Sequence, residues 1–408
     1  MDNDASLTQS PPSTTWWMPQ PPPAATAPAP PPPARPRGRG MLLGVAGIAL
    51  ASALVGGATG ATLVHGGSTT ASGPITISGS MAQSASLPTG SVEQAATTIG
   101  ASVVTVEVTG AATSQGFGGS SATTSDTGSG VVLRSDGYIL TNNHVVSAAA
   151  GGGSVSVTLS NGKTYGASIV GTDATSDLAV LKVSGVGGLT PATFANSDQV
   201  RVGQAVLAVG APLGLSNTVT EGIVSTLHRP VRTGEAGASA QSVIDALQTD
   251  AAVNPGNSGG ALVDLSGRVV GVPSAIATVG SSSSGQSGSI GVGFAIPSND
   301  AVKVANQLIA TGHATHPQIG ISATDAAGGT TGAPGVGALV RQVSSGGPAA
   351  AAGLQAGDVI TNVGDRVVTD ADSLIVAVRS NNPGSTVAVT YTRGGASATA
   401  QVRLQSSS

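Results

Sequence analysis

The sequence predicts a mainly β protein built from many short strands. Hydrophobic residues make up 40% of the 408 residues but aromatic residues only 2%, so the core must consist of Val, Ala, Leu and Ile. The β-branched members of this set favour strands. From about Val92, short apolar segments follow one another, separated by turn pairs such as Asp136-Gly137 and Asn161-Gly162. Such a pattern is typical of an all-β barrel or sandwich.

Residues 1–40 contain 12 of the 24 prolines and predict an extended or disordered tail. A ligand for a proline-binding module is the alternative. Residues 41–64 carry no charge, and a helix rising about 1.5 Å per residue would span a bilayer core of about 30 Å with them. Residues 65–91 are rich in Ser, Thr and Gly and predict a flexible stalk.

Arginines at positions 35, 37 and 39 precede the apolar segment. By the positive-inside rule, the predicted single-pass helix leaves the N-terminus in the cytoplasm and the rest of the chain outside the cell membrane. A cleaved signal peptide is the alternative, because small residues follow the apolar run. The lead before that run is long for a signal peptide.

The predicted strands lie in the following segments: SVVTVEV, GVVLRSDGYILTNNHVV, SVSVTL, YGASIVG, LAVLKV, QAVLAVG and RVVGVPSAI. Two Gly/Ser-rich linkers, Gly110–Gly128 and Ala277–Ser289, interrupt them. Loops of this length inside a compact domain are often functional.

The segment PSNDAVKVANQLIATG changes from a strand to a helix period. Val302, Ala305 and Ile309 would share one face, with Val304 and Leu308 beside them. Ser298 or Asn299 would cap the start, and the final glycine would end the helix.

A smaller unit follows from about Thr315 to Leu404. It has β segments GALVRQV and STVAVTYT, a short helix after Pro348, and a helix over about Ala371 to Arg379 behind the candidate cap Asp370.

Ser258 lies in TDAAVNPGNSGGAL, between two pairs of small residues. Small neighbours let a substrate carbonyl approach the backbone, and convergent N–H groups there can stabilise an oxyanion. In a chain with 60 glycines, an ordinary turn explains the segment alone equally well. A serine nucleophile also needs a base and an acid elsewhere in the chain.

His144 is the only one of five histidines that closes a predicted strand in the first half of the β-rich unit. Asp177 immediately precedes an apolar strand, with Asp173 as a competitor. Taken singly, each suits a structural or turn position. Together, His144, Asp177 and Ser258 follow in the chymotrypsin order, in which two β-barrels enclose the site.

The strings TNNHVV, DLAVLKV, RVGQAVLAVGAPLGL, TVTEGIVS, QTDAAVNPGNSGGALVDLSGRVVG and GVGFAIP resemble the HtrA/DegP family of trypsin-like serine proteases. The resemblance covers about residues 92–405. It implies a chymotrypsin-like double β-barrel protease domain over residues 92–312 and an α+β PDZ domain over residues 315–405.

By this resemblance, His144 is the general base, Asp177 its orienting acid and Ser258 the nucleophile. The N–H groups of Gly256 and Ser258 would form the oxyanion hole, with Asn257 between them.

The resemblance also implies a substrate pocket that takes small or medium aliphatic side chains. No acid lies at its floor, because Ala252 occupies the position six before Ser258. The candidate pocket residues are Ala252, Asn254, Gly291 and Phe294.

In the smaller unit, Ile319-Gly320-Ile321 matches the PDZ carboxylate-binding loop, which binds peptide C-termini beside a strand edge. One departure is Ala211-Pro212, where the family usually has Asn-Pro. A homotrimer is the assembly that many relatives adopt.

The implied function is a membrane-anchored extracytoplasmic serine endopeptidase that degrades unfolded or misfolded proteins. A chaperone-like or PDZ-based sensor protein with a resting catalytic site is the alternative. An anchored adaptor acting through the proline-rich tail is a third hypothesis.

Several classes of function find no support in the composition. The net charge is −4 without a basic tract, which argues against nucleic-acid binding. The absence of cysteine excludes disulfides and thiolate catalysis. Neither clustered metal ligands nor a phosphate-binding loop appears, so no metal or other cofactor is expected.

Overall fold

The computed structural model describes residues 90–110, 125–149, 152–211, 218–233, 242–274, 291–326 and 337–407. The expected tail over residues 1–40, apolar segment over residues 41–64 and linker over Ala277–Ser289 lie outside them, as does nearly all of the expected stalk. In the part of the chain that is described, no helix is long and apolar enough to cross a membrane.

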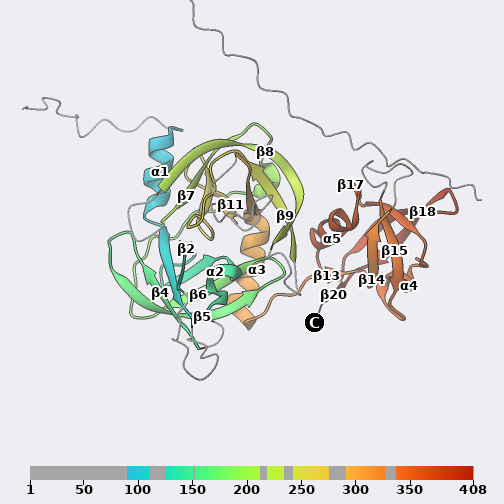
Figure 1. Cartoon of the computed structure of the whole chain (residues 1–408), viewed down its shortest axis with the longest axis horizontal. Coiled ribbons are helices and arrows are strands. Elements are labelled where there is room, and N and C mark those ends of the chain that lie inside the picture. Colours follow the sequence, from blue (N-terminus) through green and yellow to red (C-terminus); the bar gives the residue numbers. More distant parts are fainter. Residues whose placement is uncertain are drawn as a thin grey trace, which may run out of the picture. The chain divides into compact units, whose positions relative to one another are not determined.

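Six antiparallel strands close the first barrel in the order β1-β2-β3-β6-β5-β4 (Figure 1). They are β1 (Val103–Thr109), β2 (Ser125–Val132), β3 (Tyr138–Thr141), β4 (Ser154–Thr158), β5 (Thr164–Asp173) and β6 (Leu178–Val183). The short helix α2 (Asn143–Ser147) follows β3.

A second closed barrel has the order β10-β11-β12-β9-β8-β7. Its strands are β7 (Ala205–Gly210), β8 (Thr218–Thr233), β9 (Ser242–Thr249), β10 (Ala261–Asp264), β11 (Val269–Pro273) and β12 (Gly293–Pro297). A 3₁₀ turn, η1 (Ser197–Gln199), precedes it. The predicted mainly β fold with two barrels is therefore confirmed.

Strands that pack on both faces read as continuous apolar runs in the sequence. β10, β11 and β12 are buried at every position, because one face fills the barrel and the other contacts neighbouring elements. Strands with one solvent face alternate instead, as β4 does. These patterns explain why strand positions were readable from the sequence.

Helix α1 (Val92–Gly100) was not predicted, since strands were expected from Val92 onward. Its Ala95 and Ile99 pack in a cluster with residues of both barrels. Ser91, placed in the expected stalk, caps this helix by accepting the N–H of Gln94 (3.1 Å). In addition, β2 already begins at Ser125, inside the expected linker Gly110–Gly128.

Helix α3 (Ser298–Thr311) forms where it was predicted and ends at Gly312, which has φ of +79°. The expected side-chain cap is absent: Pro297 occupies the cap position, and the Ser298 hydroxyl donates to the carbonyl of Ala195 (2.6 Å). Of the expected positions, Val304, Ala305 and Leu308 are buried, together with Ala301, whereas Val302 and Ile309 are only partly buried.

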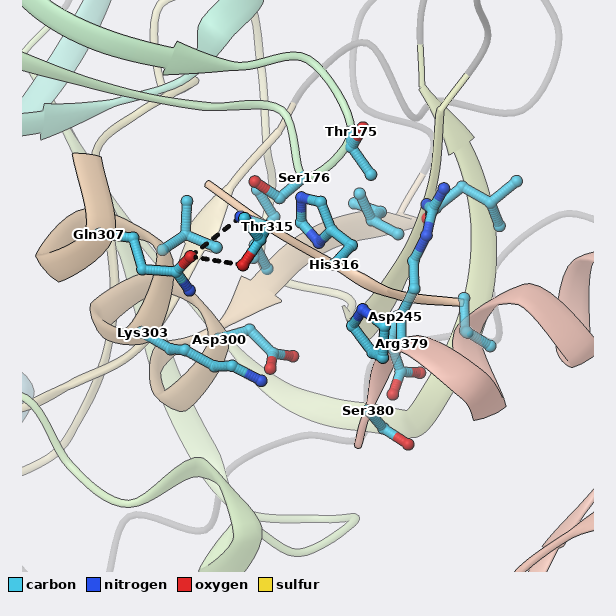
Figure 2. Close-up of a pocket in the computed structure, with 16 residues that line it drawn as sticks. Thr175, Ser176, Asp245, Asp300, Lys303, Gln307, Thr315, His316, Arg379 and Ser380 are labelled. Atoms are coloured by element: carbon cyan, nitrogen blue, oxygen red, sulfur yellow. Dashed lines mark hydrogen bonds between the residues drawn. The ribbon is translucent and has the colours of Figure 1, made fainter. Parts of the chain in front are cut away.

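The chain leaves α3 through a short connection fastened to the helix. The Gln307 side-chain oxygen accepts hydrogen bonds from the backbone N–H (2.9 Å) and the hydroxyl (3.2 Å) of Thr315, drawn as dashed lines in Figure 2.

The C-terminal unit contains a sheet ordered β14-β15-β16-β18-β19, with β17 beside β16, and a two-stranded sheet of β13 and β20. The strands are β13 (Pro317–Gln318), β14 (Ile321–Asp325), β15 (Ala338–Val343), β16 (Val359–Val363), β17 (Arg366–Val367), β18 (Thr386–Arg393), β19 (Ala396–Arg403) and β20 (Gln405–Ser406). Helices α4 (Pro348–Ala351) and α5 (Ala371–Arg379) lie where they were predicted, and Asp370 caps α5.

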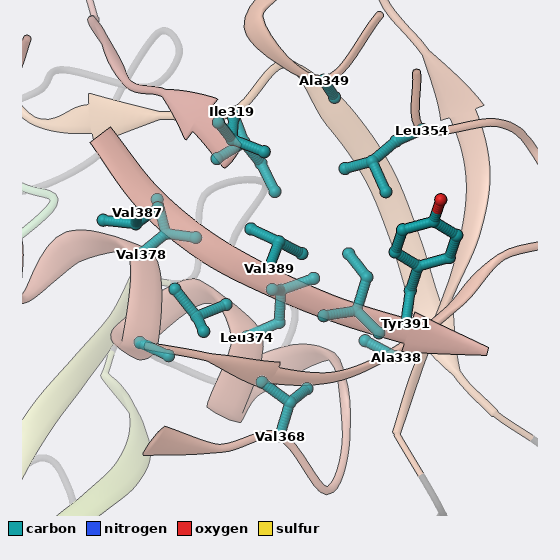
Figure 3. Close-up of a cluster of buried hydrophobic side chains, with 14 of the residues drawn as sticks. Ile319, Ala338, Ala349, Leu354, Val368, Leu374, Val378, Val387, Val389 and Tyr391 are labelled. Carbon is teal, nitrogen blue, oxygen red and sulfur yellow. The ribbon is translucent and has the colours of Figure 1, made fainter. Parts of the chain in front are cut away.

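This unit has a hydrophobic core of its own. Leu374 and Val378 on α5 face Val389 and Tyr391 on β18 (Figure 3). Every buried member of the cluster lies between Ile319 and Leu404, so this core needs no residue of the barrels.

Candidate active site

His144 and Asp177 are joined side chain to side chain. The His144 Nδ1 lies 2.9 Å from Oδ2 and 3.0 Å from Oδ1 of Asp177, and the His144 backbone N–H donates to Oδ1 (3.1 Å). Only 4% of Asp177 is exposed. The carboxylate therefore fixes both the ring and the backbone of the histidine, and a hydrogen on Nδ1 leaves Nε2 as the acceptor.

The Asp177 backbone is held in an unusual conformation. Its φ of +56° lies in the left-handed region, which Asp tolerates better than most residues. Its carbonyl accepts the backbone N–H of Asn143 (3.1 Å) and the side-chain amide of Asn142 (2.8 Å). The β5–β6 turn is thus fastened to the start of α2, where His144 lies.

Ser274 provides a further hydrogen bond that sequence analysis missed. Its hydroxyl donates to Asp177 Oδ2 (2.9 Å) and the residue is buried. The carboxylate is therefore held from both barrels, because Ser274 directly follows β11. A serine after an apolar strand carries no signal of such a role in the sequence alone.

Ser258 lies in the loop between β9 and β10 and is 5% exposed. Its carbonyl accepts the N–H of Ser129 in the first barrel (2.8 Å), and the next N–H, of Gly259, donates to Pro273, the residue before Ser274 (3.0 Å). A Cβ on Gly259 would lie 2.3 Å from the Ser129 carbonyl oxygen and 3.1 Å from the backbone nitrogen of Asn142. This loop therefore presses against the segment that carries His144.

The turn before Ser258 is held by hydrogen bonds within it. Gly256 has φ of +97°, a conformation that favours glycine. The Asn257 N–H donates to the carbonyl of Asn254 (3.0 Å), and its side-chain amide donates to that of Ala252 (3.3 Å). Asn257 is 2% exposed and points inward.

The four candidate pocket residues lie in different surroundings. The Ala252 carbonyl accepts the Thr220 hydroxyl (2.8 Å), and Gly291 has φ of +81°. The Phe294 side chain is 4% exposed and belongs to the hydrophobic cluster that α3 covers, while its carbonyl accepts the N–H of Ser274 (3.0 Å). Their role as a substrate pocket stays a prediction.

The competing acid, Asp173, has another partner. It accepts hydrogen bonds from His316 Nε2 (2.9 Å) and from the Ser176 hydroxyl. Although burial alone would raise the pKa of Asp173, these hydrogen bonds outweigh it and lower the pKa. Of the two acids, the structure pairs Asp177 with His144.

In the C-terminal unit, Gly320 has φ of +71° between Ile319 and the first residue of β14. The carbonyls of Ile319 and Gly320 accept the N–H groups of Ala349 and Ser344 (2.9 Å each). β14 is an edge strand, and a groove beside it is lined by Ile321, Leu374 and Val378 among others. Such an edge can accept a peptide strand.

No group of three or more His, Cys, Asp or Glu side chains that would hold a metal occurs among the described residues.

Two closed six-stranded barrels, a His–Asp pair beside a serine loop, and a C-terminal groove with an edge strand define a trypsin-like serine protease with a PDZ domain. A family model for the trypsin-like peptidase domain matches residues 128–272, and one for the PDZ domain matches residues 317–404.

The chain belongs to the HtrA-type serine proteases. It is 47% identical over 383 residues to Serine protease PepD of Mycobacterium tuberculosis, which covers 91% of this chain and 78% of that protein. It is 44% identical over 314 residues to Serine protease Do-like HtrA of Lactococcus lactis subsp. lactis, covering 71% and 75%.

Solved structures of the HtrA-type protease AlgW have the same fold. The complex with a decapeptide has a TM-score of 0.56 at 31% identity, covering 78% of this chain and 99% of that chain. The complex with a tripeptide has a TM-score of 0.57 at 32% identity, covering 78% and 98%.

Proposed function

We propose that the protein cleaves peptide bonds with His144, Asp177 and Ser258 as its catalytic triad. The carrying observation is the pairing of the His144 Nδ1 with the Asp177 carboxylate at 2.9 Å, beside the loop that holds Ser258. In this mechanism, Nε2 takes the Ser258 proton as the hydroxyl attacks the substrate carbonyl. The same nitrogen then protonates the leaving amine, while the buried carboxylate stabilises the charged ring.

The backbone N–H groups of Gly256 and Ser258 would bind the oxyanion that forms on attack. Removal of one such donor typically costs about 10²–10³ in turnover. Two features support this assignment: the left-handed conformation of Gly256 and the inward-facing Asn257 between the two donors. Ala252, Asn254, Gly291 and Phe294 would form the pocket for a small or medium aliphatic residue.

The PDZ domain would bind peptide C-termini, for recruitment of substrates or for regulation. The N–H groups of the loop Ile319-Gly320-Ile321 would receive the terminal carboxylate, and β14 would pair with the peptide. Support comes from the groove beside this edge strand, whose lining includes Ile321, Leu374 and Val378, and from the similarity to AlgW, which was solved with a decapeptide.

Unfolded or misfolded proteins are the proposed substrates, outside the cytoplasm and next to the cell membrane. The uncharged segment over residues 41–64 and the arginines before it support an uncleaved single-pass anchor. The homotrimer common among relatives is the proposed assembly. Fractionation tests the anchor: the full chain is expected in membranes, and a chain starting at residue 65 is not.

The central test follows cleavage of an unfolded protein by the region from about residue 72, at neutral pH. Ser258→Ala is expected to abolish cleavage, because it removes the attacking hydroxyl. Ser266→Ala, which changes an exposed serine in the β10–β11 turn, is the matched control and is expected to remain active. Equal cleavage by the wild type and Ser258→Ala would refute the triad. No cleavage by a folded wild type would favour the chaperone-like or sensor alternative.

A further inference from the structure

Ser129 lies in β2, opposite the loop of Ser258, and is fully buried. Space around it is limited. A Cβ on Gly128 would lie 2.7 Å from the Val145 side chain, and one on Gly130 would lie 2.6 Å from the Ile139 side chain. Glycines on both sides of Ser129 thus let β2 approach α2 and β3 closely, and the serine is the only one of these three residues with a side chain.

All polar atoms of Ser129 are engaged. Its N–H donates to the carbonyl of Ser258 (2.8 Å), and its hydroxyl donates to the carbonyl of Gly256 (2.5 Å). The same hydroxyl accepts the N–H of Ala211 at the end of β7 (2.8 Å), and the Ser129 carbonyl accepts the Thr141 hydroxyl (2.7 Å). One residue of the first barrel therefore forms hydrogen bonds with the turn on both sides of Asn257.

We infer that Ser129 is a positioning residue for the oxyanion hole; this inference rests on the proposed roles of Gly256 and Ser258. The Ser129 hydroxyl acts through the Gly256 carbonyl and touches no reacting atom. The backbone N–H of Ser129 fixes the second donor residue in the same way, but only the hydroxyl can be removed by substitution.

The physical need for this bond follows from the conformation of Gly256. A residue without Cβ meets little steric resistance to backbone rotation, so its φ of +97° must be held by its surroundings. Rotation of the Gly256–Asn257 peptide would change the direction of the neighbouring N–H groups. An oxyanion hole works because its donors are fixed before the charge develops.

The bond to Ala211 adds a second anchor. The hydroxyl joins the oxyanion turn to the end of β7. Loss of the Ser129 hydroxyl would leave a buried carbonyl and a buried N–H without this partner, which favours rearrangement of the turn.

The test uses the full-length protein in mild detergent and compares the wild type with Ser129→Ala. With a chromogenic peptide that has valine before the cut, kcat is expected to fall about 10²-fold, as when one oxyanion donor is lost. KM is expected to change less than about threefold, since ground-state binding does not use the oxyanion hole. Affinity for a peptide boronic acid, whose adduct mimics the tetrahedral intermediate, should fall in parallel with kcat.

Thr105→Val is the matched control. It removes a buried hydroxyl that bonds to the same residue, Ala211, but does not contact the turn. We expect its kcat and boronate affinity to stay within about threefold of the wild type, even if its free energy of unfolding falls as much as that of Ser129→Ala. Ser129→Cys, which replaces the hydroxyl by a somewhat larger thiol that is only a weak donor, is expected to lie between Ser129→Ala and the wild type.

Different results would overturn the positioning role of Ser129 and the proposed catalytic function. A folded Ser129→Ala that keeps kcat within about threefold, or that loses no more than Thr105→Val, overturns the inference. Modification of Ser258 by a fluorophosphonate, located by mass spectrometry, tests the proposed function on its own. A folded wild type that is not modified would remove both proposals. Normal modification of the wild type and normal modification of Ser129→Ala would remove only the positioning role.

Discussion

At the scale of single residues, the Asp177 carboxylate is bonded from two directions. His144 approaches it from α2, and the Ser274 hydroxyl approaches Oδ2 from the end of β11. Because one contact comes from each barrel, the orientation of the carboxylate depends on both barrels being correctly packed.

Ser274→Ala removes one of these two contacts. A hydrogen bond to a charged group is worth about 1.5–3 kcal/mol, so we expect kcat to fall about tenfold to a hundredfold while the protein stays folded. Steady-state kinetics on the proposed peptide substrate would measure the change. Activity within about twofold of the wild type would show that His144 alone orients the carboxylate.

At the scale of elements, the first turn of α3 carries a carboxylate whose ionised form is disfavoured by its surroundings. Asp300 projects into a cavity that also contains Lys303 and Asp245 (Figure 2). Burial, followed by repulsion from Asp245, raises the pKa of Asp300 to about 6. Asp245 itself is held ionised: burial opposes this, but hydrogen bonds from His228 and Arg366 lower its pKa.

The sign of the resulting pH dependence is the reverse of that of a salt-bridged acid. The native state binds the Asp300 proton more tightly than the unfolded state, so its contribution to stability falls as pH rises from about 4 to about 6. Asp300→Asn is expected to raise the free energy of unfolding by about 1–3 kcal/mol at pH 8. The gain should vanish below about pH 4.

Urea unfolding at a series of pH values would measure this difference. Asp365→Asn removes an exposed carboxylate of the β16–β17 turn and is the control for the loss of one charge. A gain from Asp300→Asn that does not depend on pH, or that matches the control, would contradict the assignment.

The helices show which parts of the fold can be predicted from the sequence. α5 was predicted to the residue because its signals are local: an apolar helical period behind a capping Asp370. α1 was missed because Ala95 and Ile99 become a buried face only when both barrels supply the partner surface. Ser129 and Ser274 were missed for the same reason, since their partners lie 127 and 97 positions away in the chain.

At the scale of the whole molecule, the hydrophobic cores are divided between the barrels and the PDZ domain. The PDZ cluster contains no residue before Ile319, and the ion pairs Arg366–Asp245 and Arg232–Asp372 link this domain to β9 and β8. The more exposed of the two pairs, Arg232–Asp372, contributes little, about 0–1 kcal/mol. Arg366–Asp245 is partly buried, but neither pair belongs to the PDZ cluster. We therefore expect a chain of residues 315–408 to fold cooperatively by itself.

Calorimetry of that segment and of the full chain would test this. One kcal/mol shifts the midpoint of a domain this small by about 4–8 °C, so the two PDZ transitions should agree within about that range. A segment without a cooperative transition would show that the PDZ fold depends on the barrels.

The scarcity of aromatic side chains has a practical consequence for spectroscopy. Both tryptophans, Trp16 and Trp17, precede the described residues, and the three tyrosines are Tyr138 and Tyr165 in the first barrel and Tyr391 in the PDZ core. The chain after residue 40 therefore has no indole emission, and the strands of the second barrel have no phenol emission either. In a chain that starts after residue 40, a single tryptophan introduced beside the Ser258 loop would be the only indole and would report on that loop.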